Sequence, residues 1–263
     1  MLNPSKHGPW AVVTGASAGL GEHFARQLAA SGLNLFLVAR RQERLEVLCD
    51  QLKRAHGVEA RYAVLDLAQE GSDLALDQAT ADLDVGLLVD NAGAGYFGRF
   101  DGQDPERLAA MIRLNCIGVM LVAHRFVGRF KRRGSGGIVI VASLAGFQAT
   151  PWMSVYGATK GFDLLFGEGL AQELKGTGID VLVLNPGSTS TEFGKVAGST
   201  GGGYSMRPEK VVGGAIRALG RKVLYVPGVS NKLVVWVGRI FPRGFVAYMS
   251  GRTLRKITPP EHR

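Results

Sequence analysis

Tyr156 and Lys160 are side chains of complementary acid–base character that stand four positions apart. In a helix this spacing places both on one face. A tyrosine ordinarily titrates at about pH 10, and a nearby ammonium favours the phenolate and lowers the pKa of the phenol. Because such a phenol can serve as a general acid or base at neutral pH, the pair predicts proton transfer at Tyr156.

Ser143 follows the apolar run 138–142, which predicts a strand. The carboxyl ends of parallel strands form the edge at which ligands bind, and a hydroxyl there can hydrogen-bond a substrate oxygen. A serine that only satisfies local backbone groups is the alternative, and it would be preferred if Ser143 stood alone.

A glycine-rich turn, Thr14 to Gly21, lies between the first predicted strand and the first predicted helix. Glycines let the backbone approach a pyrophosphate closely, and the following helix offers N–H groups and the positive end of its dipole. A turn that merely connects strand and helix is the alternative. The position at the first βα junction favours a dinucleotide site, although the spacing Gly-x-x-x-Gly-x-Gly differs from the commoner fingerprint.

Arg40 and Arg41 follow the second predicted strand, where an NAD-preferring fold carries an acid that binds the ribose 2′-hydroxyl. Ala39 stands at that place, and the first acid after it is Glu43. A guanidinium suits a 2′-phosphate, so the sequence favours NADP(H) over NAD(H), with Arg40 the better candidate. The alternative is that both arginines are solvent-facing residues at the start of a helix.

The elements that must position these residues alternate between short Val/Leu/Ile-rich runs and longer stretches of helical period. This order predicts a Rossmann-type, doubly wound α/β fold, with a mostly parallel sheet of about seven strands and helices on both faces. The predicted strands are 10–13, 33–39, 62–65, 85–89, 138–142, 179–184 and 223–226. The predicted helices are 21–30, 42–55, 105–130 with Asp104 as its N-cap, 152–174, and one that starts at 207–209.

The composition, 46% hydrophobic and 20% charged, is typical of a globular protein, and no break divides residues 1–231, so we predict one catalytic domain there. The net charge of +9 is concentrated in residues 221–263, and the rest of the chain is nearly neutral. A nucleic-acid-binding protein more often carries its charge on the folded body, so nucleic acid is not expected as a partner.

The spacing of Cys49 and Cys116 matches no disulfide framework and no metal motif, and no metal is expected. Residues 1–10 lack an apolar run followed by a small-residue cleavage site. We find no stretch that reaches the roughly 18 apolar residues of a membrane span. The expected location is therefore the cytoplasm.

Together these motifs resemble the short-chain dehydrogenase/reductase (SDR) family over residues 9–226. The resemblance implies that Tyr156 donates a proton to a carbonyl oxygen as hydride arrives from the nicotinamide. It also implies that Ser143 orients the carbonyl and that Asn115 anchors a water for proton relay. Lys160 would hold the nicotinamide ribose and lower the pKa of the tyrosine. The motifs that match in order and spacing are Thr14 to Gly21, Asn91-Ala92-Gly93, Asn115, Ser143, Tyr156 to Lys160 and Pro186-Gly187.

The resemblance also implies a cofactor site along the carboxyl edge of the sheet. Asp66 would bind the adenine amino group, and the segment from Pro186 to Thr191 would reach the nicotinamide amide and the phosphates. Asp90 stands where the family commonly has asparagine. That residue is usually a structural hydrogen-bonder, so catalysis is expected to be retained, although a carboxylate near the adenosine could weaken cofactor binding through repulsion. Besides Tyr156 and Lys160, the expected cofactor contacts are Gly15, Ser17, Ala18, Gly19, Leu20, Gly21, Arg40, Arg41, Asp66, Leu67, Asn91, Ala92, Gly93, Pro186, Gly187, Thr189 and Thr191.

Two further segments point to the substrate. The stretch from Phe193 to Met206 predicts a mobile lid, with a surface loop as the alternative. Residues 232–263 form a basic, apolar extension that is expected to line the pocket, or alternatively to pack on another subunit or lie at a membrane interface. This tail resembles that of DltE-like and long-chain 3-oxoacyl reductases. The glycines of the predicted lid are Gly194, Gly198, Gly201, Gly202 and Gly203.

The sequence therefore predicts an NADPH-dependent oxidoreductase that reduces a lipophilic ketone, aldehyde or 3-oxoacyl group to an alcohol. An NADP(H)-binding sensor or scaffold without turnover and a membrane-surface adaptor are the alternatives. The intact Ser143, Tyr156 and Lys160 argue against the sensor, because a binding protein has no need of all three. The family resemblance and the two long helices suggest a homodimer or homotetramer.

Overall fold

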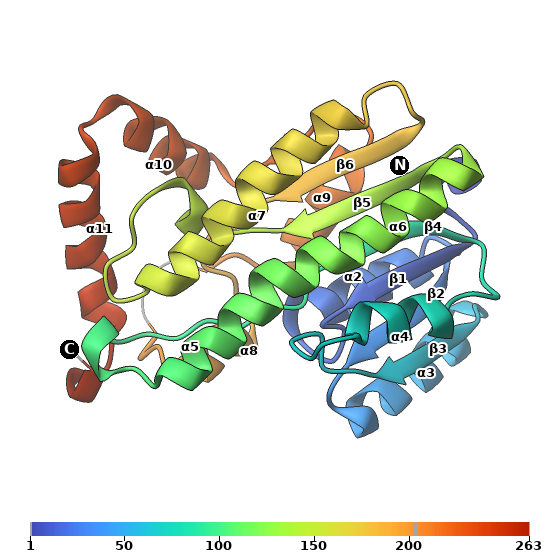
Figure 1. The fold of residues 1–263 in the computed structure, drawn as a ribbon, viewed down its shortest axis with the longest axis horizontal. Helices are drawn as coiled ribbons and strands as arrows, with labels where there is room; N and C mark the ends of the chain where they lie inside the picture. The colour runs from blue at the N-terminus through green and yellow to red at the C-terminus, as the bar shows by residue number, and fades with distance from the viewer. Residues whose placement is uncertain (1, 202–204, 263) are drawn as a thin grey trace.

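The computed structural model describes residues 2–201 and 205–262, and within them the chain forms one seven-stranded sheet. The strand order is β3-β2-β1-β4-β5-β6-β7, and every pairing is parallel. Helices cover both faces of the sheet (Figure 1), so the predicted doubly wound fold is confirmed. The strands are β1 Trp10–Thr14, β2 Asn34–Ala39, β3 Ala60–Val64, β4 Val85–Asp90, β5 Gly136–Val141, β6 Ile179–Leu184 and β7 Leu224–Tyr225.

The strand order reverses between β1 and β4, where the chain leaves one half of the sheet and starts the other. Parallel sheets of this kind bind ligands in the crevice outside the carboxyl ends of the strands at such a switch point. The loops that follow β1 and β4 therefore meet there, which brings the glycine turn beside Asn91 and Ala92.

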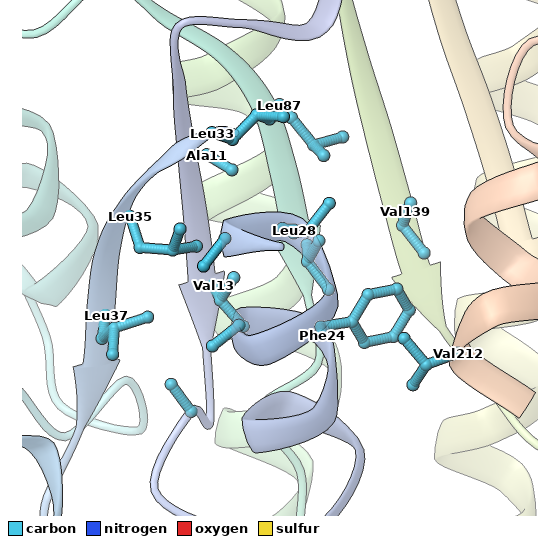
Figure 2. Close-up of a cluster of buried hydrophobic side chains, with 14 of the residues drawn as sticks. Ala11, Val13, Phe24, Leu28, Leu33, Leu35, Leu37, Leu87, Val139 and Val212 are labelled. Atoms are coloured by element: carbon cyan, nitrogen blue, oxygen red, sulfur yellow. The ribbon is translucent and has the colours of Figure 1, made fainter. Parts of the chain in front are cut away.

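One face of the sheet is covered by α2 Gly19–Ala29, α3 Gln42–His56 and α9 Pro208–Ala218. Figure 2 shows Phe24 and Leu28 of α2 directed into the core beside Val13 and Val139 of the sheet and Val212 of α9. Phe24 and Leu28 are fully buried, and each such side chain contributes about 1.5–3 kcal/mol on burial. This packing fixes the N-terminus of α2 at the switch point.

The other face carries α4 Ser72–Ala79, α5 Pro105–Ile112, α6 Val119–Arg133 and α7 Ser154–Glu173. Figure 1 shows α6 and α7 running across the sheet, with α5 continuing past the carboxyl ends of the strands. Asp104 caps α5 as predicted, since its carboxylate accepts a hydrogen bond from the Glu106 N–H at 2.9 Å.

The predicted long helix over 105–130 is confirmed as the helical stretch Pro105–Arg133, but its middle is the π-helical turn η2 Arg113–Gly118 between α5 and α6. Hydrophobic period alone cannot reveal a π turn, since the apolar residues on either side keep helical spacing. Gly118 lies so close to the loop after β3 that a Cβ there would stand 2.7 Å from the Leu67 carbonyl oxygen.

Among the described residues, the helical stretch Pro105–Arg133 is long enough to cross a membrane and contains an 18-residue window with a mean hydropathy of 1.4. The expectation that no stretch of the chain is long and apolar enough to span a membrane was therefore too strict. In the fold this stretch buries Phe126 and Phe130 against the sheet, and Arg125 on its outer side pairs with Asp73 of α4 at 2.8 Å. Its apolar residues thus form the sheet-facing stripe of an amphipathic helix.

The tail consists of two helices, α10 Val229–Ile240 and α11 Arg243–Ile257, which turn at Pro242 and stand at one end of the molecule (Figure 1). The sequence predicted a basic, apolar extension over residues 232–263, but no helices were predicted there. The inner side of α11 reaches the body of the protein, where Leu254 packs in a cluster with Met153 and Tyr156.

The other departures from prediction are small. Strand ends shift by up to two residues, as at β3 and β5, and the first part of the predicted lid is the helix α8 Glu192–Val196. Gly202 and Gly203 lie outside the described residues. The remaining short helices are α1 Pro4–His7, η1 Phe100–Gly102, η3 Leu144–Phe147 and η4 Pro260–His262.

Candidate active site

The glycine turn forms a close-fitting cradle at the N-terminus of α2. Gly15 has φ +64°, and a Cβ there would lie 2.8 Å from Asn91 Nδ2. A Cβ on Gly21 would collide with the Gly15 carbonyl oxygen. No side chain caps α2, because its N-cap residue is Ala18, so its first-turn N–H groups face outward without a side-chain acceptor. Such an end of a helix suits a phosphate group.

A hollow of about 540 Å³ opens at this cradle, between the glycine turn and the start of α8. Thr191 comes from the loop after β6, and its Cβ lies 3.3 Å from the Cβ position of Gly19. The predicted cofactor residues of the two loops are therefore brought together. The residues present fit a dinucleotide phosphate at this place. The lining residues are Ala18, Gly19, Glu22, His23, Ser190, Thr191, Glu192 and Lys195.

The two arginines after β2 lie in different surroundings. Arg40 is 71% exposed in its side chain, and its Nη1 stands 3.9 Å from Asp66 Oδ2. Arg41 donates through Nε to Ser17 Oγ at 3.1 Å, and its Nη1 reaches Glu192 at 3.3 Å. Asp66 and both arginines thus stand near the glycine turn, with guanidinium groups open to solvent and able to meet a 2′-phosphate.

The loop after β4 is fixed to the glycine turn by hydrogen bonds. Thr14 Oγ1 accepts from the N–H groups of Asn91 and Ala92, both at 2.9 Å, and the Asn91 amide donates to the Thr14 carbonyl oxygen. Leu67 is buried with its side chain in the core, so only its backbone faces the loops. Pro186 is tied to η3, since its carbonyl oxygen accepts from the Leu144 N–H at 3.0 Å.

Ser143, Tyr156 and Lys160 come together as predicted. Ser143 caps η3 at the end of β5, and its hydroxyl interacts with the phenol of Tyr156. Tyr156 and Lys160 lie one turn apart on α7, and both side chains are buried. Lys160 Nζ reaches the end of β5, where it donates to the Val141 carbonyl oxygen at 2.8 Å. The start of α7 is thereby pinned to the carboxyl edge of the sheet.

The electrostatics of Tyr156 differ from the prediction. Burial raises the pKa of the Tyr156 phenol, because the phenolate loses water, while Lys160 and Ser143 act in the opposite direction. Lys160 therefore lowers the pKa of the phenol as expected, but burial outweighs it and the net shift is upward. The phenol is protonated at neutral pH, which is the form that a proton donor requires.

Asn115 is fully buried in the π turn, and its side chain is engaged on all sides. Its Nδ2 donates to the Ala94 carbonyl oxygen and to Thr159 Oγ1, and its Oδ1 accepts from the Ala94 N–H, each at 2.9 Å. The amide thus fastens η2 to the loop after β4 and to α7. A water relay at Asn115 stays a prediction.

Three further residues complete the site, and of these the sequence had named only Phe193, as the first residue of the predicted lid. Asp163 pairs with Lys160, Oδ2 to Nζ, at 2.8 Å, and is fully buried. The ring of Phe193 lies against the ring of Tyr156, with centroids 5.5 Å apart. The side-chain amide of Asn231, on α10, occupies the space beside Gly187, where a Cβ would lie 2.7 Å from Asn231 Oδ1. The spacing of three between Lys160 and Asp163 was the available signal for that pair, and the other two contacts join segments far apart in sequence.

Apolar side chains surround the phenol. The cluster that contains Tyr156 includes residues from α5, α7 and the loop after β4, and α11 adds Leu254 to it. The groups that flank a carbonyl bound at Tyr156 would therefore contact apolar side chains. The cluster comprises Leu108, Met111, Met153, Tyr156, Ala94, Tyr96, Phe97, Ala145, Val155 and Leu254.

Comparison with known proteins agrees with this geometry. The short chain dehydrogenase family model matches residues 9–200. A 7beta-hydroxysteroid dehydrogenase of Collinsella aerofaciens is 32% identical over 252 residues, which cover 93% of this chain and 96% of that protein. A very-long-chain 3-oxoacyl-CoA reductase of Podospora anserina is 35% identical over 196 residues, which cover 73% of this chain and 58% of that protein.

Among solved structures, a short-chain dehydrogenase from Sphingobium yanoikuyae in complex with NADPH superimposes with a TM-score of 0.81. It is 32% identical, and the match covers 88% of this chain and 93% of that chain. The family match, together with the cradle and the Ser143–Tyr156–Lys160 arrangement, confirms the resemblance. The chain therefore belongs to the short-chain dehydrogenase family, oxidoreductases that act on CH–OH and C=O groups.

Proposed function

We propose that this protein is an NADP(H)-dependent reductase of a lipophilic carbonyl compound, with Tyr156 as the proton donor. The observation that carries the proposal is the buried, protonated phenol of Tyr156, which stands beside Ser143 and Lys160 at the edge of the sheet that also holds the glycine cradle. A sensor without turnover would gain nothing from a buried phenol and a buried ammonium, because burying such groups is costly.

Each residue has a separate task in this reduction. The bound dinucleotide supplies the hydride that reaches the carbonyl carbon. As negative charge develops on the carbonyl oxygen, the Ser143 hydroxyl stabilises it and the Tyr156 hydroxyl transfers its proton to it. The alcohol that forms has then gained one hydride and one proton. The ammonium of Lys160 stabilises the phenolate left behind, since its effect on the Tyr156 phenol is to lower the pKa.

The substrate class follows from the apolar cluster around Tyr156 and from the relatives. A hydroxysteroid dehydrogenase and a very-long-chain 3-oxoacyl-CoA reductase are both named for large apolar substrates. Burial of apolar groups contributes about 25 cal/mol per Å² to binding, so an apolar pocket wall selects such substrates. The preference for NADP(H) is supported by Arg40 and Arg41 after β2 and by the relative that binds NADPH.

Oxidation of NADPH in the presence of candidate ketones tests this function. The panel consists of 3-oxoacyl thioesters of increasing chain length, keto steroids and small water-soluble ketones. We expect turnover that increases with the apolar size of the ketone and that is lost in Tyr156→Phe. NADPH binding without turnover on the whole panel would instead support the non-catalytic sensor.

A second proposal, contact of the tail with a membrane surface, is supported by the outer side of α10 and α11. No acidic residue occurs from 229 to 257, while Lys232, Arg239 and Arg243 stand among exposed apolar side chains. Basic, apolar helices of this kind lie at the surface of anionic bilayers. The exposed apolar residues are Val229, Leu233, Val234, Trp236, Ile240, Phe241, Phe245, Tyr248 and Met249.

Flotation with vesicles that contain anionic lipid tests the membrane contact. We expect the wild-type protein to float, and the variant Trp236→Ser/Phe241→Ser to remain in solution. Equal recovery of both proteins with the vesicles, or flotation of neither, would contradict the contact. Light scattering on the same two proteins tests the proposed homo-oligomer, and a smaller assembly in the variant would assign this face to subunit contact instead.

A further inference from the structure

Two buried carboxylates, Asp90 and Asp163, act electrostatically on the ammonium of Lys160, and Asp163 is the one that pairs with it. Asp163 is fully buried, Lys160 is 4% exposed and Asp90 is 2% exposed. Asp163 lies on α7, and Asp90 is the last residue of β4, the strand that pairs with β5. None of the roles derived above for proton donation or hydride transfer uses either carboxylate.

The Asp163 carboxylate fixes the direction of the lysine. A lysine ammonium has three N–H groups. Two of them are occupied, one by Asp163 Oδ2 and one by the Val141 carbonyl oxygen, both at 2.8 Å. The Nζ atom lies 3.5 Å from the Cβ position of Gly93, so the ammonium is next to the loop after β4. This arrangement leaves one donor for a ligand and determines where it points.

Asp90 lies on the strand next to the one whose end Lys160 binds. Its backbone is in register with Ile140 on β5, one residue before the carbonyl that Lys160 binds. One oxygen, Oδ1, accepts from Thr14 Oγ1 at 3.1 Å. That threonine hydroxyl also accepts from the N–H of Asn91, which links Asp90 to the loop of the dinucleotide site.

The charges do not balance if both acids are ionised. Among the described residues, Asp90 Oδ2 and Asp163 Oδ1 are buried without a hydrogen-bond partner. A buried carboxylate oxygen without a donor is costly, and the cost is relieved when the group carries a proton. Asp163 has the ammonium as its partner, so Asp90 is the acid that carries the proton.

We propose that Asp90, Lys160 and Asp163 form one buried charge cluster that sets the affinity for the anionic dinucleotide, with Asp163 as the positioning residue of Lys160. This inference rests on the proposed dinucleotide site. While Asp90 keeps its proton, the cluster is neutral. When Asp90 loses its proton, a negative charge appears beneath the loop that faces the dinucleotide, and binding weakens.

The pKa values of the groups around the cluster support a transition in an accessible range. Burial raises the pKa of Asp90 to about 8, and Asp163 adds to this effect while Thr14 and Lys160 oppose it. The other titratable groups that face the cluster are Tyr156 on α7, whose pKa is raised by burial, and Cys116 on η2, whose pKa is raised to about 11 by burial. Burial raises the pKa of Asp163 as well, but Lys160 opposes that shift through its charge and its hydrogen bond, so we assign the change of charge near pH 8 to Asp90.

The test is the dissociation constant of NADPH, measured by fluorescence from about pH 6 to about pH 9, in the wild type, Asp90→Asn, Asp163→Asn and Asp73→Asn. Asp73 is a matched control, because it is buried and paired with Arg125 on the far helices. We expect the wild-type constant to rise several-fold through about pH 8, and the constant of Asp90→Asn to stay level. In Asp163→Asn the midpoint moves to lower pH, because Asp90 becomes the partner of Lys160.

A rise with pH that persists in Asp90→Asn, or a midpoint in folded Asp163→Asn equal to that of Asp73→Asn, would overturn the proposal. A role of Asp163 in stability alone would leave that midpoint in place. If Asp163→Asn does not fold, the test is the pH dependence of the NADPH dissociation constant in Asp90→Asn compared with the wild type. A wild type that binds no NADPH at any pH contradicts both the dinucleotide site and the effect on affinity, whereas level binding across this range contradicts the cluster alone.

Discussion

The side chain of Arg41 donates through Nε to Ser17 Oγ at 3.1 Å, and thereby joins the end of β2 to the glycine turn. Arg40, one residue earlier, extends into solvent with its Nη1 3.9 Å from Asp66 Oδ2. The two guanidinium groups therefore flank the place where the adenosine end of a dinucleotide would approach the turn. The two arginines are expected to contribute differently to cofactor binding. The Arg41 side chain is held by its hydrogen bond to Ser17, whereas the exposed Arg40 side chain can move toward a ligand.

This difference predicts the effect of Arg40→Asp on cofactor preference. The substitution removes a charge-assisted contact to a 2′-phosphate and supplies an acceptor for a ribose hydroxyl, so the preference shifts from NADPH toward NADH. A lost charged hydrogen bond of about 1.5–3 kcal/mol corresponds to a change of roughly 10- to 100-fold in the ratio of kcat/KM values. Steady-state kinetics with both cofactors measure it.

Arg54→Asp is the matched control, since Arg54 lies in the last turn of α3, away from the glycine turn. It changes the net charge equally and is expected to leave the ratio as in the wild type. If Arg40→Asp also leaves the ratio unchanged while Arg41→Asp alters it, the phosphate contact belongs to Arg41.

Tyr156→Phe removes the proton donor and retains the aromatic ring. We expect kcat to fall by several hundred-fold or more, the effect of removing a general acid. The ring still packs against Phe193, so thermal stability should change little. Tyr96→Phe serves as the control, because Tyr96 belongs to the same apolar cluster and contacts Arg107 through its ring face. Comparable turnover of Tyr156→Phe and Tyr96→Phe would remove Tyr156 from the chemistry.

The glycine cradle makes a prediction about stability. A methyl group at Gly21 has no room beside the Gly15 carbonyl oxygen, so Gly21→Ala should lower the free energy of unfolding by about 3 kcal/mol or more. Gly169 lies in the middle of α7 with nothing near its Cβ position. Gly169→Ala should therefore raise the free energy of unfolding by about 0.5–1 kcal/mol. Denaturant titration measures both, and equal effects would contradict the close packing of the turn.

The parts of this site that could be predicted from sequence are those in which the residue type alone carries the signal. Val/Leu/Ile runs marked the buried strands, and strand ends marked Ser143 and the glycine turn. The role of Asp163 could not be predicted, because it depends on the burial of the carboxylate. The π turn at Asn115 could not be predicted either, because it keeps the apolar spacing of a helix. Burial also reversed the expected pKa shift of Tyr156, since the cost of desolvation depends on packing by Phe193 and α7 that the sequence does not specify.

The raised pKa of Asp90 predicts how the stability of the protein depends on pH. In the unfolded chain Asp90 loses its proton at about pH 3.8, whereas burial delays that loss to about pH 8 in the folded protein. Between these values the folded chain holds one more proton at this group than the unfolded chain. The free energy of unfolding therefore falls as pH rises, by up to about 1.4 kcal/mol per pH unit.

Asp90→Asn removes this dependence, because the amide has the shape of the protonated acid and does not titrate. The variant should match the wild type near pH 4, gain stability over it as pH rises, and show no further gain above about pH 8. Thermal unfolding at a series of pH values measures the difference, with Asp73→Asn as a second buried aspartate whose pairing with Arg125 is lost. A difference between Asp90→Asn and wild type that stays constant from pH 4 to pH 8 would mean that Asp90 is ionised throughout in the folded protein. The two buried carboxylates would then both be charged beside a single ammonium.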